Sequence, residues 1–323
     1  MDENTILSFS LGIFQIRVFV KFFKNVCALS KLIQFDISEK GIYCQSLDDT
    51  HCVLFHLELK NDWFKHFYLK EGIEKTSISL ECTYIYKVLN CANASTREIR
   101  FYHLENNQDV INIDIINWEN ENGEGENEVE TESKNIMTNL NHSNKEFEIV
   151  LIDFSNEDLS IPKISYDVDI ILDSHGFEKI LNEINEFGED IDIVCNEENI
   201  ILKTTGEMGK YSIKILEEQI NEYGIVEDLN YEVTFGMNII NKIIKFLSLS
   251  PMVEINFIEN NPTRILIPLD NPNQKTKQIE LENKKTEKEK NSEAEDSGED
   301  GEDGEDAEES ENFLIFHIAP KMK

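Results

Sequence analysis

The stretch ENFLIFHIAPKMK, residues 311–323, follows the most acidic run of the chain. Within residues 313–318, Phe, Ile and His alternate with Leu, Phe and Ile, which is the period-two pattern of a β-strand. An acidic tail at the edge of a domain would need no such strand after it. We therefore predict that the acidic run is a loop inserted within a domain, and that residues 313–318 form a strand of that domain.

Length and charge limit what kind of protein this is. The chain has 323 residues, 40% of them hydrophobic, which is enough for two domains with ordinary cores. The net charge of −34 argues against a nucleic-acid partner, but more than half of it lies in residues 119–132 and 293–311. There Glu and Asp run with Gly, Asn and Ser, so we expect mobile insertions. The rest of the chain is only moderately acidic.

Cysteine usage and hydropathy exclude several classes. The six cysteines show no CxxC pair and no histidine at metal-ligand spacing, so we expect small buried side chains in a reducing compartment, with neither metal nor cofactor. The apolar segment 6–23 is interrupted by Arg17 and Lys21 and follows an acidic start, which is unlike a signal peptide. No uninterrupted apolar run elsewhere is long enough to span a bilayer, so no membrane partner is expected.

Two parts of the chain can be laid on one another. FVKFFKNVCALSKLIQFDISEKGIYCQSLDDTHCVLFHL, from Phe19, matches FEKILNEINEFGEDIDIVCNEENIILKTTGEMGKYSIKI, from Phe177, and both read as helix, strand, turn and strand. Each is followed by a short helix and a hairpin that turns at Glu-Asn-Asn, where Asn tolerates the left-handed conformation. The sequence thus predicts an α+β fold with one unit duplicated, two helices packed on an antiparallel sheet in each copy.

The domain boundaries follow from this repeat. We expect an N-terminal domain at 1–117, an acidic insertion with an interdomain connector at 118–162, and a C-terminal domain at 163–323 containing an acidic loop at about 275–312.

The predicted helices carry lysines on one face. In a helix at about 19–33 the apolar side chains recur at helical spacing, while Lys21, Lys24 and Lys31 fall on the opposite face. A second helix near 237–247 turns Lys242 and Lys245 outward in the same way. One such face is an ordinary solvated surface. Because a lysine-bearing face recurs on separate helices of a strongly acidic chain, the pattern favours a helix-lined surface that binds phosphates.

Three stretches resemble the sliding clamps of the proliferating cell nuclear antigen family. GIYCQSLDDTHCVLFHLEL (41–59) resembles the strands and loop around the family's central histidine, here His51. FEIVLIDFSNEDLSIP (147–162) resembles the interdomain linker, and FLIFHIAPKMK resembles the C-terminal strand with its Ala-Pro-Lys ending. With the repeat, the resemblance covers nearly everything except the acidic insertions.

The resemblance implies a ring-forming DNA clamp: a homotrimer closed head to tail around double-stranded DNA, with helices inside and sheets outside. The DNA-facing residues would be Lys21, Lys24, Lys31, Lys87, Lys179, Lys242 and Lys245. The helix at 177–187 departs from the family, because it carries Glu178, Glu183 and Glu186 where the family is more basic. We expect the subunits to join through two exposed strand edges, represented by Val110, Ile111, Ile113, Ile115 and by Lys210, Tyr211, Ile213, Ile215.

The resemblance also implies a docking pocket beneath the linker. It would bind peptides of the form Gln-x-x-aliphatic-x-x-aromatic-aromatic from DNA polymerases, clamp loaders, nucleases and ligases. Its walls would be Leu47, His51, Leu54, Leu159, Ile161, Pro262, Ala319 and Pro320. The expected location is the nucleus, or a viral replication compartment if a virus encodes the chain.

Other functions were weighed against a processivity clamp. The sequence lacks HExxH, Walker, G-x-S-x-G and Cys/His nucleophile patterns, so we do not expect an enzyme. A subunit of a heterotrimeric checkpoint clamp would share the fold. An acidic histone chaperone is a further alternative, although the strand after the acidic run and the lysine-bearing helices count against it.

Overall fold

A computed structural model describes residues 4–118, 143–156, 159–161, 164–207, 209–270 and 312–321. The acidic stretches 119–132 and 293–311 lie outside the described residues, as does most of the loop expected at 275–312. In the part of the chain that is described, no helix is both long and apolar enough to cross a membrane.

The first half of the chain folds as one α+β unit. Its elements are, in order, β1 (Thr5–Leu11), α1 (Ile13–Val26), β2 (Leu32–Ser38), β3 (Gly41–Leu47), β4 (Val53–Lys60), a short 3-10 turn (Asn61–Trp63), β5 (His66–Leu69), β6 (Lys75–Glu81), α2 (Cys82–Leu89), β7 (Thr96–Leu104), β8 (Asn107–Asn117) and β9 (Lys145–Val150).

The second half repeats this order. Its elements are β10 (Val168–Asp173), α4 (Ser174–Asn185), β11 (Asp190–Asn196), β12 (Asn199–Gly206), β13 (Gly209–Leu216), a 3-10 turn (Glu217–Gln219), β14 (Glu222–Ile225), β15 (Tyr231–Gly236), α5 (Met237–Ile244), a 3-10 turn (Leu247–Leu249), β16 (Met252–Phe257), β17 (Thr263–Pro268) and β18 (Phe313–Ile318). The predicted α+β fold with a duplicated unit is confirmed.

β18 joins the two halves into one sheet. It pairs antiparallel with β17 of its own half on one side and with β4 of the first half on the other. The result is a nine-stranded sheet with the order β14-β10-β16-β17-β18-β4-β3-β2-β6. A five-stranded sheet, β5-β1-β7-β8-β9, and a four-stranded sheet, β13-β12-β11-β15, flank it. The predicted strand at 313–318 therefore exists and forms the seam between the halves.

Four phenylalanines pack across this seam. Phe316 of β18 has no exposed surface, and its ring centroid lies 6.3 Å from that of Phe55 in β4 and 5.0 Å from that of Phe246 after α5. Phe22 of α1 completes the cluster, 6.2 Å from Phe246 and 6.5 Å from Phe55. Aromatic pairs at these separations add to the free energy gained from burial alone. The two halves therefore share part of their hydrophobic core.

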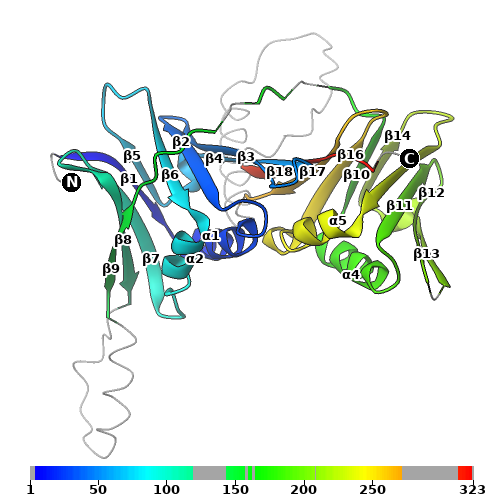
Figure 1. Cartoon of the computed structure of the whole chain (residues 1–323), viewed down its shortest axis with the longest axis horizontal. Coiled ribbons are helices and arrows are strands. Elements are labelled where there is room, and N and C mark those ends of the chain that lie inside the picture. The colour runs from blue at the N-terminus through cyan, green and yellow to red at the C-terminus, as the bar shows by residue number, and fades with distance from the viewer. Residues whose placement is uncertain are drawn as a thin grey trace, which may run out of the picture.

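The sheets form an arch, and the four α-helices of the described residues lie on its inner side. Figure 1 shows α1 and α2 below the first half, α4 and α5 below the second, and β9 and β13 at opposite ends of the arch. The helices lie there because each has an apolar face buried against a sheet, as Phe19, Phe22 and Phe23 are in α1. The opposite faces of the helices line the inside of the arch.

The first helix lies earlier in the chain than the expected span of 19–33. It begins at Ile13, ends at Val26, and is closed by a turn in which the backbone N–H of Ser30 donates to the Val26 carbonyl. Ile33 is buried, but in β2 rather than in the helix. A buried residue every three or four positions continued past the helix end, so the pattern alone did not mark the boundary.

The two Glu-Asn-Asn turns differ in backbone conformation. Asn260, between β16 and β17, has φ 61°, which is the left-handed conformation expected there. Among the described residues, the other non-glycine positions with positive φ are His51 and Asp228, so the turn at residues 105–107 does not use it. That turn is tighter, with Leu104 paired directly to Asn107.

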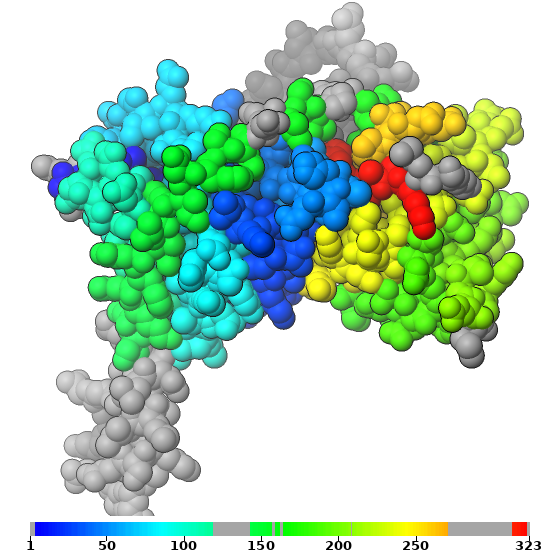
Figure 2. Space-filling view, in the orientation of Figure 1, coloured from blue at the N-terminus to red at the C-terminus, as the bar shows by residue number. Residues whose placement is uncertain are grey.

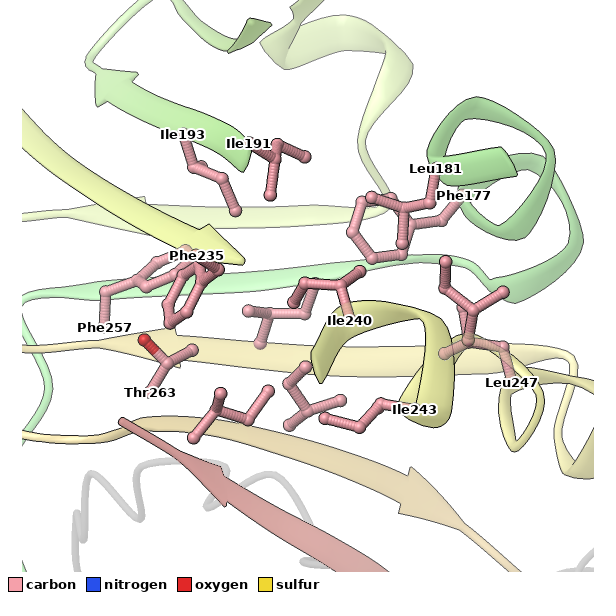
Figure 3. A pocket seen from close by; sticks show the side chains of 14 residues that line it. Phe177, Leu181, Ile191, Ile193, Phe235, Ile240, Ile243, Leu247, Phe257 and Thr263 are labelled. Carbon is pink, nitrogen blue, oxygen red and sulfur yellow. The ribbon is translucent and has the colours of Figure 1, made fainter. Parts of the chain in front are cut away.

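The second half has its own apolar core between α4, α5 and the strands. Figure 3 shows Phe177 and Leu181 from α4, and Ile240 and Ile243 from α5, around a small cavity. Its volume is about 30 Å³ and its walls are almost wholly apolar, so it is a packing void rather than a ligand site.

The seam gives the protein a specific sensitivity to acid. His56 of β4 and His317 of β18 stack at 5.6 Å beside Arg264, and burial, with the neighbouring positive charge, lowers the pKa of each from 6.5 to about 4. Between pH 6.5 and 4 the unfolded chain binds protons that the folded chain excludes, so stability falls as pH falls through this range. At about 1.4 kcal/mol per pKa unit, the loss approaches roughly 3 kcal/mol for one histidine.

We expect the double variant His56→Leu/His317→Leu to lose less stability than the wild type between pH 6.5 and 4, measured by denaturant unfolding. Equal pH dependence of the two proteins would contradict this assignment.

Candidate functional site

The inner face of α1 presents three basic side chains in a row. Arg17, Lys21 and Lys24 are all exposed and follow one another at i, i+4 and i+7, which places them on one side of the helix. The ammonium of Lys21 donates to the carbonyl of Ser248 at 2.8 Å. Arg17 was missed as a site residue because the sequence analysis treated it only as an interruption of an apolar run, although the same spacing identifies it.

Three other predicted lysines lie on the inner helices and are exposed. Lys87 is in the last turn of α2, 5.2 Å from the ring centroid of Tyr84, and Lys179 is in α4. Lys245 directly follows α5. Glu183 in α4 and Glu186 directly after it are also exposed, so the inner face of the first half is more basic than that of the second.

Two predicted DNA-facing lysines have surroundings that differ from those expected. Lys31 follows the end of α1, its carbonyl accepts from Cys82, and it lines a groove on the outer side of the first half. Lys242 is in α5 as expected, but its side chain is only 28% exposed and its ammonium lies 3.0 Å from Asp48 of the first half. Neither location favours contact with DNA on the inner side of the arch.

One of the two predicted strand edges is wrong. β8, which carries Val110, Ile111, Ile113 and Ile115, pairs with β7 on one side and with β9 on the other. β9 (Lys145–Val150) is the edge strand there, and the sequence analysis had assigned it to the linker. Alternating side chains identify a strand but not its neighbours, which explains the error.

The other predicted edge strand, β13, lies at the end of the four-stranded sheet. It carries the remaining residues expected at the subunit interface: Lys210, Tyr211, Ile213 and Ile215. Their role in subunit contact stays a prediction.

A groove lies between the first half and the connector, the segment after β9 whose described residues are 151–156 and 159–161. This connector groove has a volume of about 460 Å³. Figure 2 shows the connector, in green, running over the surface of the first half. The groove is lined by Ser30, Lys31, Leu32, Gln45, Ser46, Leu47, Asp49, Leu54, Phe154, Ser155, Asn156 and Leu159.

Only some of the predicted pocket residues line the connector groove. Leu47, Leu54 and Leu159 line the connector groove itself. His51 is exposed in the loop between β3 and β4, with φ 56°. Ile161 is half-buried in the connector and does not line the groove.

The remaining three lie at the ends of the adjoining strands. Val53, Ile318 and Thr263 form one row across β4, β18 and β17, so Ala319 and Pro262 continue from that row on neighbouring strands. The backbone N–H of Ala319 donates to the carbonyl of Cys52 at 2.9 Å, and Pro320 follows. The chain therefore has an extended outer surface from the groove to the end of β18.

Polar side chains from three adjacent strands fasten the connector to the sheet. Ser79 of β6 donates to the carbonyl of Phe154 at 2.7 Å, and its own carbonyl accepts from Ile152. Gln34 of β2 accepts from the backbone N–H of Asn156 at 2.9 Å. The connector thus follows the outer face of the sheet strand by strand.

Gln45 of β3 is the last of these fasteners and borders the groove. Its side-chain amide donates to the carbonyl of Leu159 at 3.0 Å and accepts from the Leu159 N–H at 2.8 Å. Gln45 is only 6% exposed, and its own carbonyl accepts from the side chain of Asn156. These two hydrogen bonds fix the position of Leu159, whose apolar side chain lines the groove. No local sequence pattern marks Gln45, because its partner Leu159 is far along the chain.

A duplicated α+β unit with helices inside an arch, a fastened connector and an outer groove is the arrangement of a sliding clamp. Family models described as "Proliferating cell nuclear antigen, N-terminal domain" and "Proliferating cell nuclear antigen, C-terminal domain" match residues 9–142 and 160–272. The chain belongs to the proliferating cell nuclear antigen family, the sliding clamps of DNA replication and repair.

Two curated relatives extend over most of the chain. It is 25% identical to "Proliferating cell nuclear antigen" of Dictyostelium discoideum over 269 residues, which cover 81% of this chain and 94% of the relative. It is 24% identical to "Proliferating cell nuclear antigen 2" of Drosophila melanogaster over 260 residues, which cover 76% and 88%.

The fastening of the connector can be tested through Gln45. We expect Gln45→Leu to leave Leu159 without its two hydrogen bonds and to release the connector near the groove. Amide hydrogen exchange at Leu159 would rise about tenfold or more, because the loss of roughly 1.4 kcal/mol of local stability changes an opening equilibrium tenfold. Gln34→Leu is the matched control, since it removes the acceptor of the Asn156 backbone N–H and leaves both Leu159 bonds in place. Unchanged exchange at Leu159 in the Gln45 variant would contradict this role.

Proposed function

We propose that this sliding clamp is a homotrimeric processivity factor that encircles double-stranded DNA and recruits replication and repair proteins through the connector groove. The observation that carries the proposal is the seam at β18. It holds two copies of one unit in a single arch, so α1, α2, α4 and α5 lie on the same inner side.

The ends of the arch support closure into a ring. β9 and β13 are long edge strands at opposite ends, each with one side unpaired within the described chain. β9 exposes Glu146 and Glu148, and β13 exposes Lys210 and Lys214. Pairing of β13 of one subunit with β9 of the next would satisfy both edges and bring opposite charges together. Repeated head to tail, this heterologous contact closes when the rotation per subunit fits the ring.

Other strand edges are less suited to this contact. The outer edge of β6 accepts a backbone hydrogen bond from Ile152 of the connector, and β15 accepts one from Lys321. β5 and β14 are strands of four residues. The longer free edges therefore favour β9 and β13.

The inner surface suits loose contact with DNA phosphates. Arg17, Lys21, Lys24, Lys87, Lys179 and Lys245 provide exposed positive charge, while Glu183 and Glu186 reduce it on α4. Phosphate contacts carry no sequence information and are screened by salt, so the surface would hold any duplex weakly. Retention would come from encirclement, which permits sliding.

The outer surface suits an extended peptide with apolar anchors. Leu47, Leu54 and Leu159 line one end, and the backbone beyond β18 lies at the other. A preformed groove in which apolar side chains lie among polar ones, with main-chain groups nearby, favours short peptides with aliphatic and aromatic anchors. We propose that polymerases, clamp loaders, nucleases and ligases present such peptides here, in the nucleus. A role as one subunit of a heterotrimeric checkpoint clamp is the alternative.

Retention on DNA tests encirclement. After loading, we expect the protein to stay on closed circular DNA and to leave linear DNA of the same length through its ends. The measurement is the fraction retained after gel filtration across a salt series. Salt that removes the protein equally fast from both DNA forms would show binding without encirclement.

Sedimentation tests the homotrimer and its contacts. We expect the purified chain to sediment near three times the mass of one chain, and Glu146→Lys/Glu148→Lys to weaken association because lysines would then face Lys210 and Lys214. Lys210→Glu/Lys214→Glu would weaken it likewise, and the chain carrying all four changes would recover. A wild-type monomer that trimerises only with other subunits would favour the checkpoint clamp. Equal association of all variants would contradict pairing of β9 with β13.

A further inference from the structure

Lys242 and Lys245 lie three residues apart but have different surroundings. Lys245 is exposed on the inner side, directly after α5. Lys242 is largely covered, and its ammonium lies 3.0 Å from Oδ2 of Asp48, a residue of the first half whose side chain has no exposed surface. The lysine that the sequence placed beside DNA is thus paired with a buried carboxylate across the boundary between the halves.

Asp48 shapes the loop at residues 48–52, which we call the docking loop. Its Oδ1 accepts from the backbone N–H groups of Cys52 at 2.9 Å and Val53 at 3.0 Å, while Oδ2 accepts from Thr50 Oγ1 at 2.6 Å and from Lys242. Burial raises the pKa of Asp48, but these four hydrogen bonds outweigh it and hold the pKa below its usual value. The carboxylate is therefore charged at neutral pH, and Lys242 is its charged partner.

The docking loop lies among the proposed peptide-binding residues. It begins directly after Leu47, contains His51, and ends two residues before Leu54. The carbonyl of Cys52 accepts from the N–H of Ala319, which ties the loop to the end of β18. The left-handed backbone of His51, φ 56°, is a conformation that a non-glycine residue keeps only where surrounding contacts impose it.

We propose that Lys242 positions the docking loop by neutralising buried Asp48, and that it does not contact DNA. The inference rests on the proposed peptide docking. A buried carboxylate without its counter-charge is strongly unfavourable, so the loop would open to let Asp48 reach water. The C-terminal end of α5 therefore has two lysines with different tasks: Lys245 is exposed to the inside of the ring, whereas Lys242 reaches Asp48 and supports the docking loop.

The experiment compares Lys242→Met with Lys245→Met, two changes of the same kind in neighbouring positions. The probes are a fluorescent peptide of the form Gln-x-x-aliphatic-x-x-aromatic-aromatic and salt-dependent retention on closed circular DNA. We expect Lys242→Met to weaken peptide binding about tenfold, as when a binding-competent loop is populated about one-tenth of the time, with DNA retention unchanged. Lys245→Met would do the reverse. Peptide binding unchanged in Lys242→Met, with DNA retention lost, would overturn the proposal.

Two further variants separate positioning from general loss of structure. Lys242→Arg keeps the positive charge and would retain peptide binding. Asp48→Asn combined with Lys242→Met removes both charges, so it would bind peptide better than Lys242→Met alone. A double variant that binds no better would overturn the proposal, because the loss would then not come from an unpaired charge.

Amide hydrogen exchange at Cys52 and Val53 gives a measurement independent of peptide. These N–H groups donate to Asp48, so their exchange would accelerate in Lys242→Met and not in Lys245→Met. If the wild type binds no peptide, the proposed docking function fails, while faster exchange still supports the positioning role. Unchanged exchange in Lys242→Met overturns that role.

Discussion

The pairing of β18 with β4 is the constraint on which the remaining structure depends. Without β18, the nine-stranded sheet would separate between β17 and β4, and each half would keep its own helices but lose a fixed orientation to the other. Residues 314, 316 and 318 of this strand have no exposed surface, and Phe316 brings Phe55 of the first half together with Phe246 of the second. A shared core of this kind resists hinge motion more than a polar domain interface does. This seam, together with contacts between the halves such as Phe22 with Phe246 and Lys242 with Asp48, fixes the direction of the inner helices.

The duplicated fold could be read from the sequence because it depends on local patterns. The internal repeat aligned the sequences of β2 and β3 with those of β11 and β12, and the alternation in residues 313–318 identified the last strand. Pairing partners could not be read in the same way. The alternation in β8 identifies it as a strand, but β9, which pairs with its outer side, comes after the acidic insertion and resembled part of the connector. Which strand is outermost depends on contacts between distant segments, and hydrophobic period carries no information about them.

The site residues show the same division between local and distant information. Helical spacing identifies the apolar face of α5. The residues next to Lys242 in the sequence do not indicate that its partner is Asp48, in the other half of the chain. Gln45 also has an unremarkable local sequence, and its importance comes from the two bonds to Leu159. Lys31 was misplaced for a simpler reason, since Leu29 and Ile33 continue a helical period beyond the end of α1. Polar side chains that act over long sequence distances are found from coordinates, not from composition.

The position of β18 in the chain also sets an order of events during biosynthesis. β4 is made early, but the strand that covers its free side leaves the ribosome only after the whole second repeat and the long acidic stretch. Until then the growing chain carries an apolar strand with open backbone groups, the kind of edge that invites pairing with other chains. The dense negative charge that emerges just ahead of β18 would repel neighbouring nascent chains only at the end of this interval. Completion of the sheet is thus a late, long-range folding step, and early termination of translation would leave a protein unable to bury its own edge.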